Sequence, residues 1–413
     1  MIQDKHHQRQ VYLLVLVASL GYFVDIYDLI LFLIVKKPSL LDVGVAPDHV
    51  ESTGRYLLNV QMVGMLIGGI IWGILGDKRG RLSTLFFTIL LYSIANLANG
   101  FVTNIDQYAA LRFIAGLGLA GELGIGITLV SEVMNKEARG YGTAIVAGVG
   151  IAGAALAYYV TVWTSDWRWT YWVGGILGLL LLVMRISVNE SAMFAHAKSE
   201  GVARGNFLSI FTNGKRVMKY IWCILIGVPV WFVIGIVVAG AEKFASEVFH
   251  VQGKIDGGRC VMWHYVGASI GSFLSGFLSQ YLRSRKKALY IFLSALIVTD
   301  TGFFFCQGVT VGVFYFMIFA LGVAQGYWSV FVTIASEQFG TNLRATVATT
   351  VPNIVRGMVV PMSLLYASLG TAAQGEWKGA AITGGLVVAL AFVATYKMDE
   401  TYGKDLNYIE PVE

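Results

Sequence analysis

The chain has 413 residues, of which 56% are hydrophobic and 13% charged, with a formal net charge of +5. Soluble globular proteins carry about 25% charged residues, so this composition excludes an ordinary soluble domain. Apolar stretches long enough to cross a bilayer recur along the whole chain, which predicts a multi-pass α-helical membrane protein. The first stretch is too long for a cleavable leader, so we expect it to remain as an inserted helix.

Windows that cross about 30 Å of hydrocarbon predict twelve transmembrane helices. The first six are expected at 11–36, 56–76, 83–103, 106–134, 141–164 and 170–188. The second six are expected at 217–248, 258–282, 288–307, 311–338, 347–370 and 379–397. One long polar stretch separates the two sets and is expected to be a linker at the membrane surface.

Lysine and arginine gather in the loops on one side of the predicted membrane. These loops hold Lys78, Arg79, Arg81, Lys136, Arg139, Lys198, Arg204, Lys215, Arg216, Arg283, Arg285, Lys286, Lys287 and Arg344. Loops that stay in the cytoplasm carry such an excess. We therefore expect a multi-pass protein of the cell (inner) membrane, with both termini and the linker cytoplasmic.

An internal repeat divides the chain into two halves. Ser131-Glu132, followed by Arg139, recurs about 205 residues later as Ser336-Glu337, followed by Arg344. The run from Gly73 to Arg81 has a similar counterpart that ends at Arg285. Repeated halves that face each other are typical of secondary transporters. The expected organisation is all-α, with pseudo-symmetric six-helix bundles over 1–188 and 217–397, a linker over 189–216 and a cytoplasmic tail over 398–413.

Four segments carry a resemblance to a known family. The run Gly73-Ile-Leu-Gly-Asp77-Lys-Arg-Gly-Arg81 resembles the loop signature between helices two and three of the major facilitator superfamily. Arg112, before a glycine-rich run, resembles that superfamily's fourth-helix arginine motif. Trp167-Arg168-Trp169 and Asn189-Glu190-Ser191, which flank the sixth span, resemble two further landmarks. The resemblance implies the major facilitator fold and a transport function.

Two acidic segments resemble particular branches of that superfamily. Asp25-Ile-Tyr-Asp28 in the first span and Gly121-Glu122-Leu-Gly124 in the fourth resemble segments of proton symporters for phosphate, aromatic acids and related metabolites. Sugar-porter-like branches are similar as well. This resemblance implies coupling of solute movement to protons.

The charged residues within the spans point the same way, because ionisable groups in a bilayer are costly and usually face a water-filled path. Asp25 and Asp28 share one helical face, and their depth matches that of Arg112 in the oppositely directed fourth span. We therefore expect a cluster of these three residues. Asp25, Asp28 and Glu122 are the predicted proton-coupling residues. A static ion pair, or a permanently protonated Glu122, is the structural alternative.

Arg356, at mid-membrane in the eleventh span, is the predicted contact for an anionic solute, since a guanidinium can bind a carboxylate or phosphate through two hydrogen bonds. Arg112, Asn353, Trp328 and Gln61 complete the predicted solute site. The alternatives are a permanent pair between Arg356 and an acid such as Glu122, and aromatic residues that only fill space.

Charges at the cytoplasmic helix ends predict a gate. Asp77 and Arg81 are expected to meet Glu132 and Arg139, while Glu337 and Arg344 are expected to engage Arg283 or Arg285. Simple anchoring at the lipid headgroups is the alternative. The full set of predicted gate residues is Gly73, Asp77, Arg81, Glu132, Arg139, Arg285, Glu337 and Arg344.

Together these patterns predict a secondary active transporter for proton-coupled uptake of a small polar or anionic metabolite by alternating access. The sequence shows no metal-ligand set, nucleophile–base spacing or cofactor loop. We therefore expect a monomer that is not an enzyme and needs no cofactor or metal, with the proton gradient as its energy source. Its expected partners are the solute, protons and the bilayer, with no nucleic acid.

Three alternatives stay open at this point: a proton-driven exporter, a non-transporting membrane sensor and an intramembrane enzyme. The solute is also open among phosphate, a carboxylate, a sugar, a nucleoside and a metal-chelating organic acid.

Overall fold

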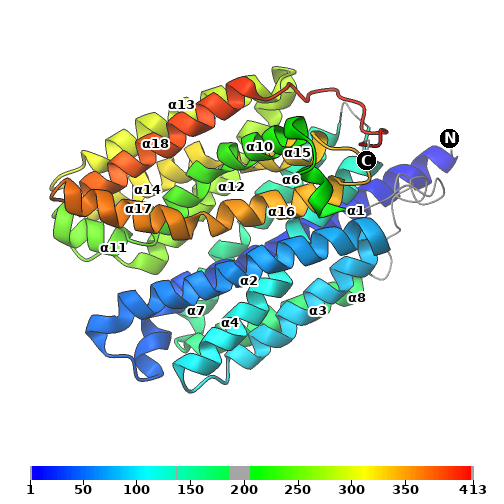
Figure 1. Ribbon diagram of the computed structural model, residues 1–413. Coiled ribbons are helices and arrows are strands. Elements are labelled where there is room, and N and C mark those ends of the chain that lie inside the picture. Colours follow the sequence, from blue (N-terminus) through cyan, green and yellow to red (C-terminus); the bar gives the residue numbers. More distant parts are fainter. Residues whose placement is uncertain (1, 136–137, 186–204, 411–413) are drawn as a thin grey trace.

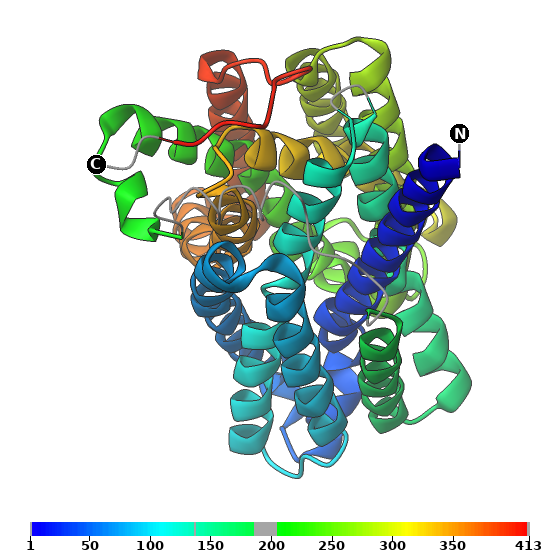
Figure 2. The same ribbon diagram turned by 90° about the vertical axis from the view of Figure 1, so that its right-hand side faces the viewer.

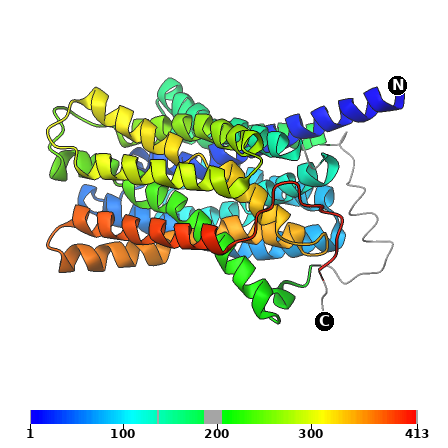
Figure 3. The ribbon, with the colours of Figure 1, turned by 90° about the horizontal axis from the view of Figure 1, so that it is seen from above.

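The computed structural model describes residues 2–135, 138–185 and 205–410. Long helices run side by side with their axes roughly along one direction (Figures 1 and 3). Many large apolar side chains, such as Trp163, Leu364 and Val298, lie exposed on the outer surface. Water would not tolerate so much exposed apolar area, and the hydrocarbon of a bilayer does.

The first half holds six spans. They are formed by α1 (Ile2–Asp42), α2 (Val50–Arg79), α3 (Arg81–Asn99), α4 (Ile105–Leu119) with α5 (Glu122–Val133), α6 (Arg139–Ile151) with α7 (Gly153–Thr164), and α8 (Trp167–Arg185). A short 3-10 turn, η1 (Pro47–His49), precedes α2. The fourth and fifth spans are each interrupted, at Ala120–Gly121 and at Ala152.

The second half holds the other six. Its helices are α10 (Gly214–Phe232), α12 (Gly257–Tyr281), α13 (Arg285–Phe304), α14 (Val311–Gln325) with α15 (Trp328–Glu337), α16 (Arg344–Gly357) with α17 (Val359–Ala372), and α18 (Glu376–Lys397). The seventh span continues beyond α10 through two π-helical segments, η3 (Val233–Val238) and η4 (Phe244–Val248), around the short α11 (Ala241–Lys243). A 3-10 turn, η2 (Phe207–Ile210), precedes α10.

Eleven helices among the described residues are long and apolar enough to cross a membrane. The remaining span, α12, has 25 residues, and its glycine, serine and other polar residues on one side pack against α6, α7, α14 and α15. Its Gly267 and Gly271 face the α14 backbone so closely that a Cβ would lie 2.2 Å from a carbonyl oxygen. The predicted all-α membrane fold with twelve helices is confirmed.

The internal repeat reappears in the helix packing. In the first half α1 packs against α6 and α8, α2 against α4, and α3 against α8. In the second half α10 packs against α16 and α18, α12 against α14, and α13 against α18. The two sets of neighbours correspond one to one, so the halves share a fold as well as a sequence pattern.

The halves meet along two helix pairs, α2 with α16 and α6 with α12, with α5 against α15 and α16 between them. Glycine allows the closest crossings. A Cβ at Gly73 would lie 3.0 Å from the Thr346 Cα, and one at Gly124 would lie 2.4 Å from the Thr349 Cα. At these two glycines the backbone of the first half is therefore in direct contact with the backbone of α16.

The start of α1 and the tail after α18 lie at the same end of the molecule, called here the terminal end (Figure 1). Figure 2 looks onto this end, where the tail residues 398–410 run across the helix ends. Residues 189–204 of the predicted linker, including Asn189, Glu190 and Ser191, lie outside the described residues. The predicted domain bounds stay predictions.

Candidate functional site

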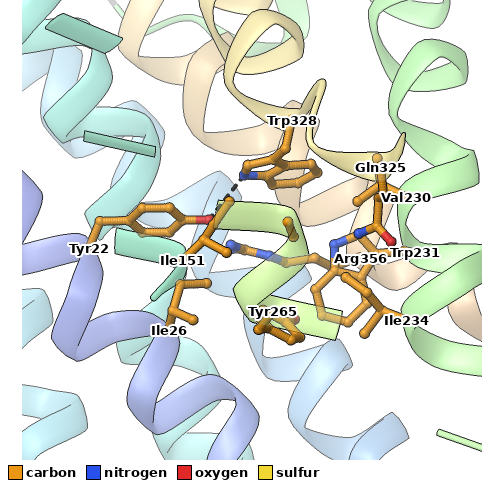
Figure 4. Close-up of a pocket in the computed structure, with 11 residues that line it drawn as sticks. Tyr22, Ile26, Ile151, Val230, Trp231, Ile234, Tyr265, Gln325, Trp328 and Arg356 are labelled. Atoms are coloured by element: carbon orange, nitrogen blue, oxygen red, sulfur yellow. Dashed lines mark hydrogen bonds between the residues drawn. The ribbon is translucent and has the colours of Figure 1, made fainter. Parts of the chain in front are cut away.

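A small cavity lies between the two halves (Figure 4). Its volume is about 20 Å³, which is room for one water molecule. The lining residues are Tyr22, Ile26 and Ile151 from the first half, and Val230, Trp231, Ile234, Tyr265, Ala268, Gln325, Trp328 and Arg356 from the second. Its lining is mostly apolar, with a few polar groups that converge on it.

Arg356 supplies the positive charge of this cavity. Its Nη1 donates to Asn353 Oδ1 at 2.9 Å, and its guanidinium carbon lies 6.0 Å and 5.8 Å from the ring centroids of Trp231 and Trp328. No ion pair to Arg356 occurs among the described residues, so the pairing with Glu122 is not seen. A buried guanidinium with donors to spare is suited to an incoming anion.

Asn353 and Trp328, both predicted from the sequence, lie close to Arg356. The Asn353 amide also donates to the Ala120 carbonyl oxygen at 2.8 Å, at the break between α4 and α5 in the other half. Trp328 Nε1 donates to the Tyr22 hydroxyl at 3.0 Å, again across the halves. The dashed line in Figure 4 marks this bond.

Tyr22 itself was not predicted. Its ring packs against α6, where a Cβ at Gly150 would be 2.1 Å from the ring. The available signal was its position one helical turn before Asp25 on the same face of α1. Asp25 is fully buried and lies within electrostatic range of the Tyr22 hydroxyl.

Asp28 and Arg112 lie inside the first half, away from the central cavity. Arg112 Nη2 donates to Asn96 Oδ1 at 2.8 Å, and its guanidinium lies 5.0 Å from the Tyr171 ring centroid. Asp28 interacts electrostatically with Arg112, as the depth argument predicted. A Cβ at Gly174 would lie 2.0 Å from Asp28 Oδ1, so glycine there makes the room for this carboxyl group.

Two further predicted residues also lie outside the lining of the cavity. Gln61 is buried between α1 and α2, where its Nε2 faces the Leu29 carbonyl oxygen at 3.5 Å. Glu122 is buried at the start of α5, two residues beyond Ala120. The structure thus brings Arg356, Asn353 and Trp328 together and places Arg112 and Gln61 elsewhere.

Buried ion pairs join the two halves at the terminal end. Arg139 Nε lies 2.8 Å from Glu337 Oε1, and Arg344 Nη1 lies 3.0 Å from Glu132 Oε1. Both pairs cross between the halves. The spacing in the sequence predicts a contact of Arg139 with acids of its own half, because a repeat does not reveal which copy of a partner lies nearer.

Pairs within each half complete this network. Arg81 reaches Glu132 at 3.0 Å and Asp77 at 3.4 Å, and Arg285 reaches Glu337 at 3.1 Å. Each glutamate therefore binds one arginine from its own half and one from the other. Of the two arginines considered for Glu337, Arg285 makes the contact.

Asp77 joins the halves by capping a helix. It accepts hydrogen bonds from the Ala345 and Thr346 amides at 3.2 Å and 2.8 Å, and from Thr346 Oγ1 at 2.6 Å. These groups belong to the first turn of α16. A carboxylate there satisfies backbone donors that have no partner within the helix and lies at the positive end of its dipole.

The tail closes the terminal end further. The carbonyl oxygens of Lys404 and Leu406 accept hydrogen bonds from Arg139 Nη2 and Arg344 Nη2, both at 2.6 Å. Glu400 accepts from Ser284 Oγ at 2.5 Å and from the Arg285 amide at 2.9 Å. The tail thus binds both arginines that cross between the halves.

At the opposite end the halves separate around a vestibule of about 850 Å³. Arg55 and Leu58 of α2, Ser363 and Tyr366 of α17, and Glu242 of α11 line it. The exposed pair Lys37–Glu242, at 3.2 Å, bridges the halves here. The molecule is therefore closed at the terminal end and open at the other, with the small cavity between.

The described helices form two similar halves with a cavity between them, which is the architecture of many membrane transporters. Residues 18–352 match the family model described as "Major Facilitator Superfamily". The chain belongs to this superfamily, as predicted.

Curated relatives of the chain are transporters. It is 25% identical to the niacin transporter NiaP of Acinetobacter baylyi, over 96% of both chains. It is 26% identical to a putative niacin/nicotinamide transporter of Bacillus subtilis, over 80% of this chain and 81% of that one. It is 31% identical to the 4-hydroxybenzoate transporter PcaK of Pseudomonas putida, over 35% of this chain and 33% of that one. The protein is accordingly a transporter and not an enzyme.

Solved structures share the fold. The proton:xylose symporter XylE bound to 6-bromo-6-deoxy-D-glucose matches with a TM-score of 0.79 at 16% identity, over 97% of this chain and 98% of that one. The partially occluded inward open conformation of XylE from E. coli matches with a TM-score of 0.69 at 16% identity, over 96% of this chain and 100% of that one.

Proposed function

We propose that the protein is a proton-coupled symporter that takes up a small organic anion by alternating access. The bias of lysine and arginine toward the loops of the terminal end supports a cytoplasmic location for that end. The conformation described above is then closed to the cytoplasm, with a vestibule on the outside.

The observation that carries this proposal is Arg356. It is buried between the two halves and has no carboxylate partner among the described residues. Asp25 lies within electrostatic range of the same Tyr22 hydroxyl, but Arg356 makes no salt bridge among the described residues, and an anionic solute would supply one. The relatives that carry niacin and 4-hydroxybenzoate, which are both carboxylic acids, support the same class of solute.

The proton is proposed to bind at the buried acids Asp25, Asp28 and Glu122. Burial favours the neutral form of a carboxyl group, whereas a nearby guanidinium such as Arg112 favours the charged form. A small change in the hydration of such a carboxyl group, as the protein opens to either side, can then decide whether the group keeps its proton. Such a group loads on the acidic outer side and releases its proton inside.

The network at the terminal end is proposed to be the cytoplasmic gate. It consists of Gly73, Asp77, Arg81, Glu132, Arg139, Arg285, Glu337 and Arg344. Opening toward the cytoplasm requires the crossing pairs to separate, which exposes their charges to water. Water then replaces the lost contacts, so the two conformations remain close in free energy.

The test uses the full chain in liposomes with an inward proton gradient. We expect labelled nicotinate or 4-hydroxybenzoate to accumulate, and Glu122→Gln or Asp28→Asn to abolish accumulation while counterflow exchange persists. The exposed acid Asp106 provides a matched control, since Asp106→Asn should leave accumulation unchanged. Full accumulation in both buried-acid variants would contradict the coupling, and everted vesicles report the direction of transport.

A further inference from the structure

We propose that Tyr22 is the contact that the first half makes with the anionic group of the solute, so that the anion is held between Tyr22 and Arg356 and ties the two halves together. This inference rests on the proposed function and assigns a binding role to a residue outside the predicted site.

The hydroxyl of Tyr22 is oriented for such a contact. It accepts the Trp328 Nε1 hydrogen bond at 3.0 Å, which leaves the phenolic hydrogen to be donated. No acceptor for that hydrogen occurs in the part of the chain that the structure describes. A phenol inside a membrane protein normally has a partner for its O–H, and an anion would supply one.

Arg356 lies where the same anion would reach it. The Tyr22 hydroxyl and the Arg356 guanidinium line one cavity and interact electrostatically. In Figure 4 the Arg356 side chain extends toward Tyr22, with Trp328 above it and Tyr265 below. Arg356 uses Nη1 for Asn353, and its Nε has no hydrogen-bond partner among the described residues.

The position of Tyr22 is fixed by the sequence around it. Its ring rests on Gly150, where any side chain would collide with it. Ile26, one turn further along α1, and Ile151 line the same side of the cavity. These neighbours add no other polar side chain, so the first half offers the anion one hydroxyl among the cavity-lining residues.

In this arrangement a bound anion would strengthen the contact between the halves. Tyr22 belongs to α1 and Arg356 to α16, so one anion that binds both residues joins the halves at mid-membrane. A charge-assisted hydrogen bond is roughly twice as strong as a neutral one. Without the anion, the Tyr22 hydroxyl already contacts the second half through its hydrogen bond with Trp328 and its electrostatic interaction with Arg356.

The experiment measures thermal stabilisation of the purified full chain by nicotinate, 4-hydroxybenzoate and phosphate, with nicotinamide as an uncharged probe. Tyr22→Phe keeps the ring on Gly150 and removes the hydroxyl. We expect it to weaken binding of the stabilising anion at least tenfold, on the order of one charge-assisted hydrogen bond, with little change for nicotinamide. Tyr159→Phe, on the exposed side of α7, is the matched control and should bind as the wild type does.

Two further variants separate binding from folding. Trp328→Phe keeps an aromatic ring but lacks the N–H that donates to Tyr22. As a single substitution it should weaken anion binding. Added to Tyr22→Phe, it should weaken anion binding no further. Gly150→Ala pushes on the Tyr22 ring and should lower anion affinity with the hydroxyl intact.

The outcomes distinguish this inference from the proposed function. If Arg356→Gln abolishes anion binding while Tyr22→Phe binds as tightly as the wild type, the role of Tyr22 is refuted and the proposed function stands. If none of the three anions stabilises the wild type, both fail.

Discussion

The guanidinium of Arg139, in the first half, lies 2.8 Å from the carboxylate of Glu337, in the second. Their counterparts Arg344 and Glu132 form the reciprocal pair at 3.0 Å. All four side chains are buried, and the tail carbonyl oxygens satisfy a further donor on each arginine. These two crossing pairs, called here the latch, join the halves at the closed terminal end, and we expect the removal of one partner to loosen that end.

Glu337→Gln should release this latch. It leaves Arg139 and Arg285 buried with a neutral partner, and breaking a buried pair in this way costs about 3–5 kcal/mol. We expect the protein to favour the state open at the terminal end. A cysteine introduced at Ser131, which directly precedes Glu132 and contacts Ser336 of the other half, should then be alkylated faster.

The matched control for this variant is Glu247→Gln, an exposed acid at the opposite end, in the same cysteine background. An unchanged alkylation rate in Glu337→Gln, with folding intact, would show that the crossing pairs do not hold the gate. The reversed pair Arg139→Glu/Glu337→Arg should restore part of the protection.

Gly124→Ala should also disfavour the closed terminal end. A Cβ at Gly124 would lie 2.4 Å from the Thr349 Cα and 2.5 Å from the Ala348 carbonyl oxygen, so α5 and α16 would have to move apart. We expect a loss of about 1–3 kcal/mol in the stability of this conformation, as for other overpacked contacts. Gly126, on the same helix, has nothing within 4 Å of its Cβ position, and Gly126→Ala should leave the thermal midpoint unchanged. Equal thermal midpoints for Gly124→Ala and Gly126→Ala would contradict the claim that a side chain at Gly124 forces α5 and α16 apart.

Substitution of Arg356 should separate charge from geometry in solute binding. Arg356→Gln removes the charge and should weaken anion binding about a hundredfold or more. Arg356→Lys keeps the charge but loses the planar fork, so a loss of about tenfold is expected. Equilibrium binding of labelled nicotinate or 4-hydroxybenzoate measures both values. Wild-type affinity in Arg356→Gln would place the anion elsewhere.

Glu400 ties the tail to the start of α13, and its contribution should depend on pH. Burial opposes its charged form, but hydrogen bonds from Ser284 and from the Arg285 and Lys286 amides outweigh that effect and hold the pKa of Glu400 below its usual value. A lowered pKa in the folded state stabilises the fold above the ordinary glutamate value of about 4.3. This stabilisation is lost as the pH falls through the folded-state pKa.

Glu400→Gln should therefore lower the thermal midpoint at neutral pH, by an amount typical of a lost helix cap, about 1 kcal/mol. The difference from the wild type should shrink as the pH falls through the lowered folded-state pKa of Glu400, because the native side chain then becomes protonated as well. The neighbouring Asp399, whose side chain has no such role among the described contacts, gives the control Asp399→Asn. A difference that grows on acidification would contradict the assignment.

The architecture could be predicted well from the sequence. The length of the apolar spans and the bias of lysine and arginine follow from the bilayer, and the repeat indicates two similar halves. Glu132, Arg139, Glu337 and Arg344 were found from their spacing alone. Their crossed pairing was not predicted, since both copies of a repeat offer the same partners and only the packing of the halves selects one.

The site was predicted less completely, because depth along a helix does not fix the direction in which a side chain points. Arg112 and Asp28 do interact, but inside the first half, whereas Arg356 reaches the cavity. Tyr22 was missed because an aromatic residue in a membrane helix is common, and its role depends on Gly150 in a distant segment. Contacts of this kind exist only once the helices have assembled.

The most direct test of the account is solute-driven proton flux. Liposomes that hold the full chain and a pH-sensitive dye are kept at zero membrane potential, and nicotinate or 4-hydroxybenzoate is added outside at equal pH on both sides. The account predicts internal acidification that accompanies labelled solute and disappears in Glu122→Gln. Labelled solute that enters the wild-type vesicles with no acidification would contradict proton-coupled uptake.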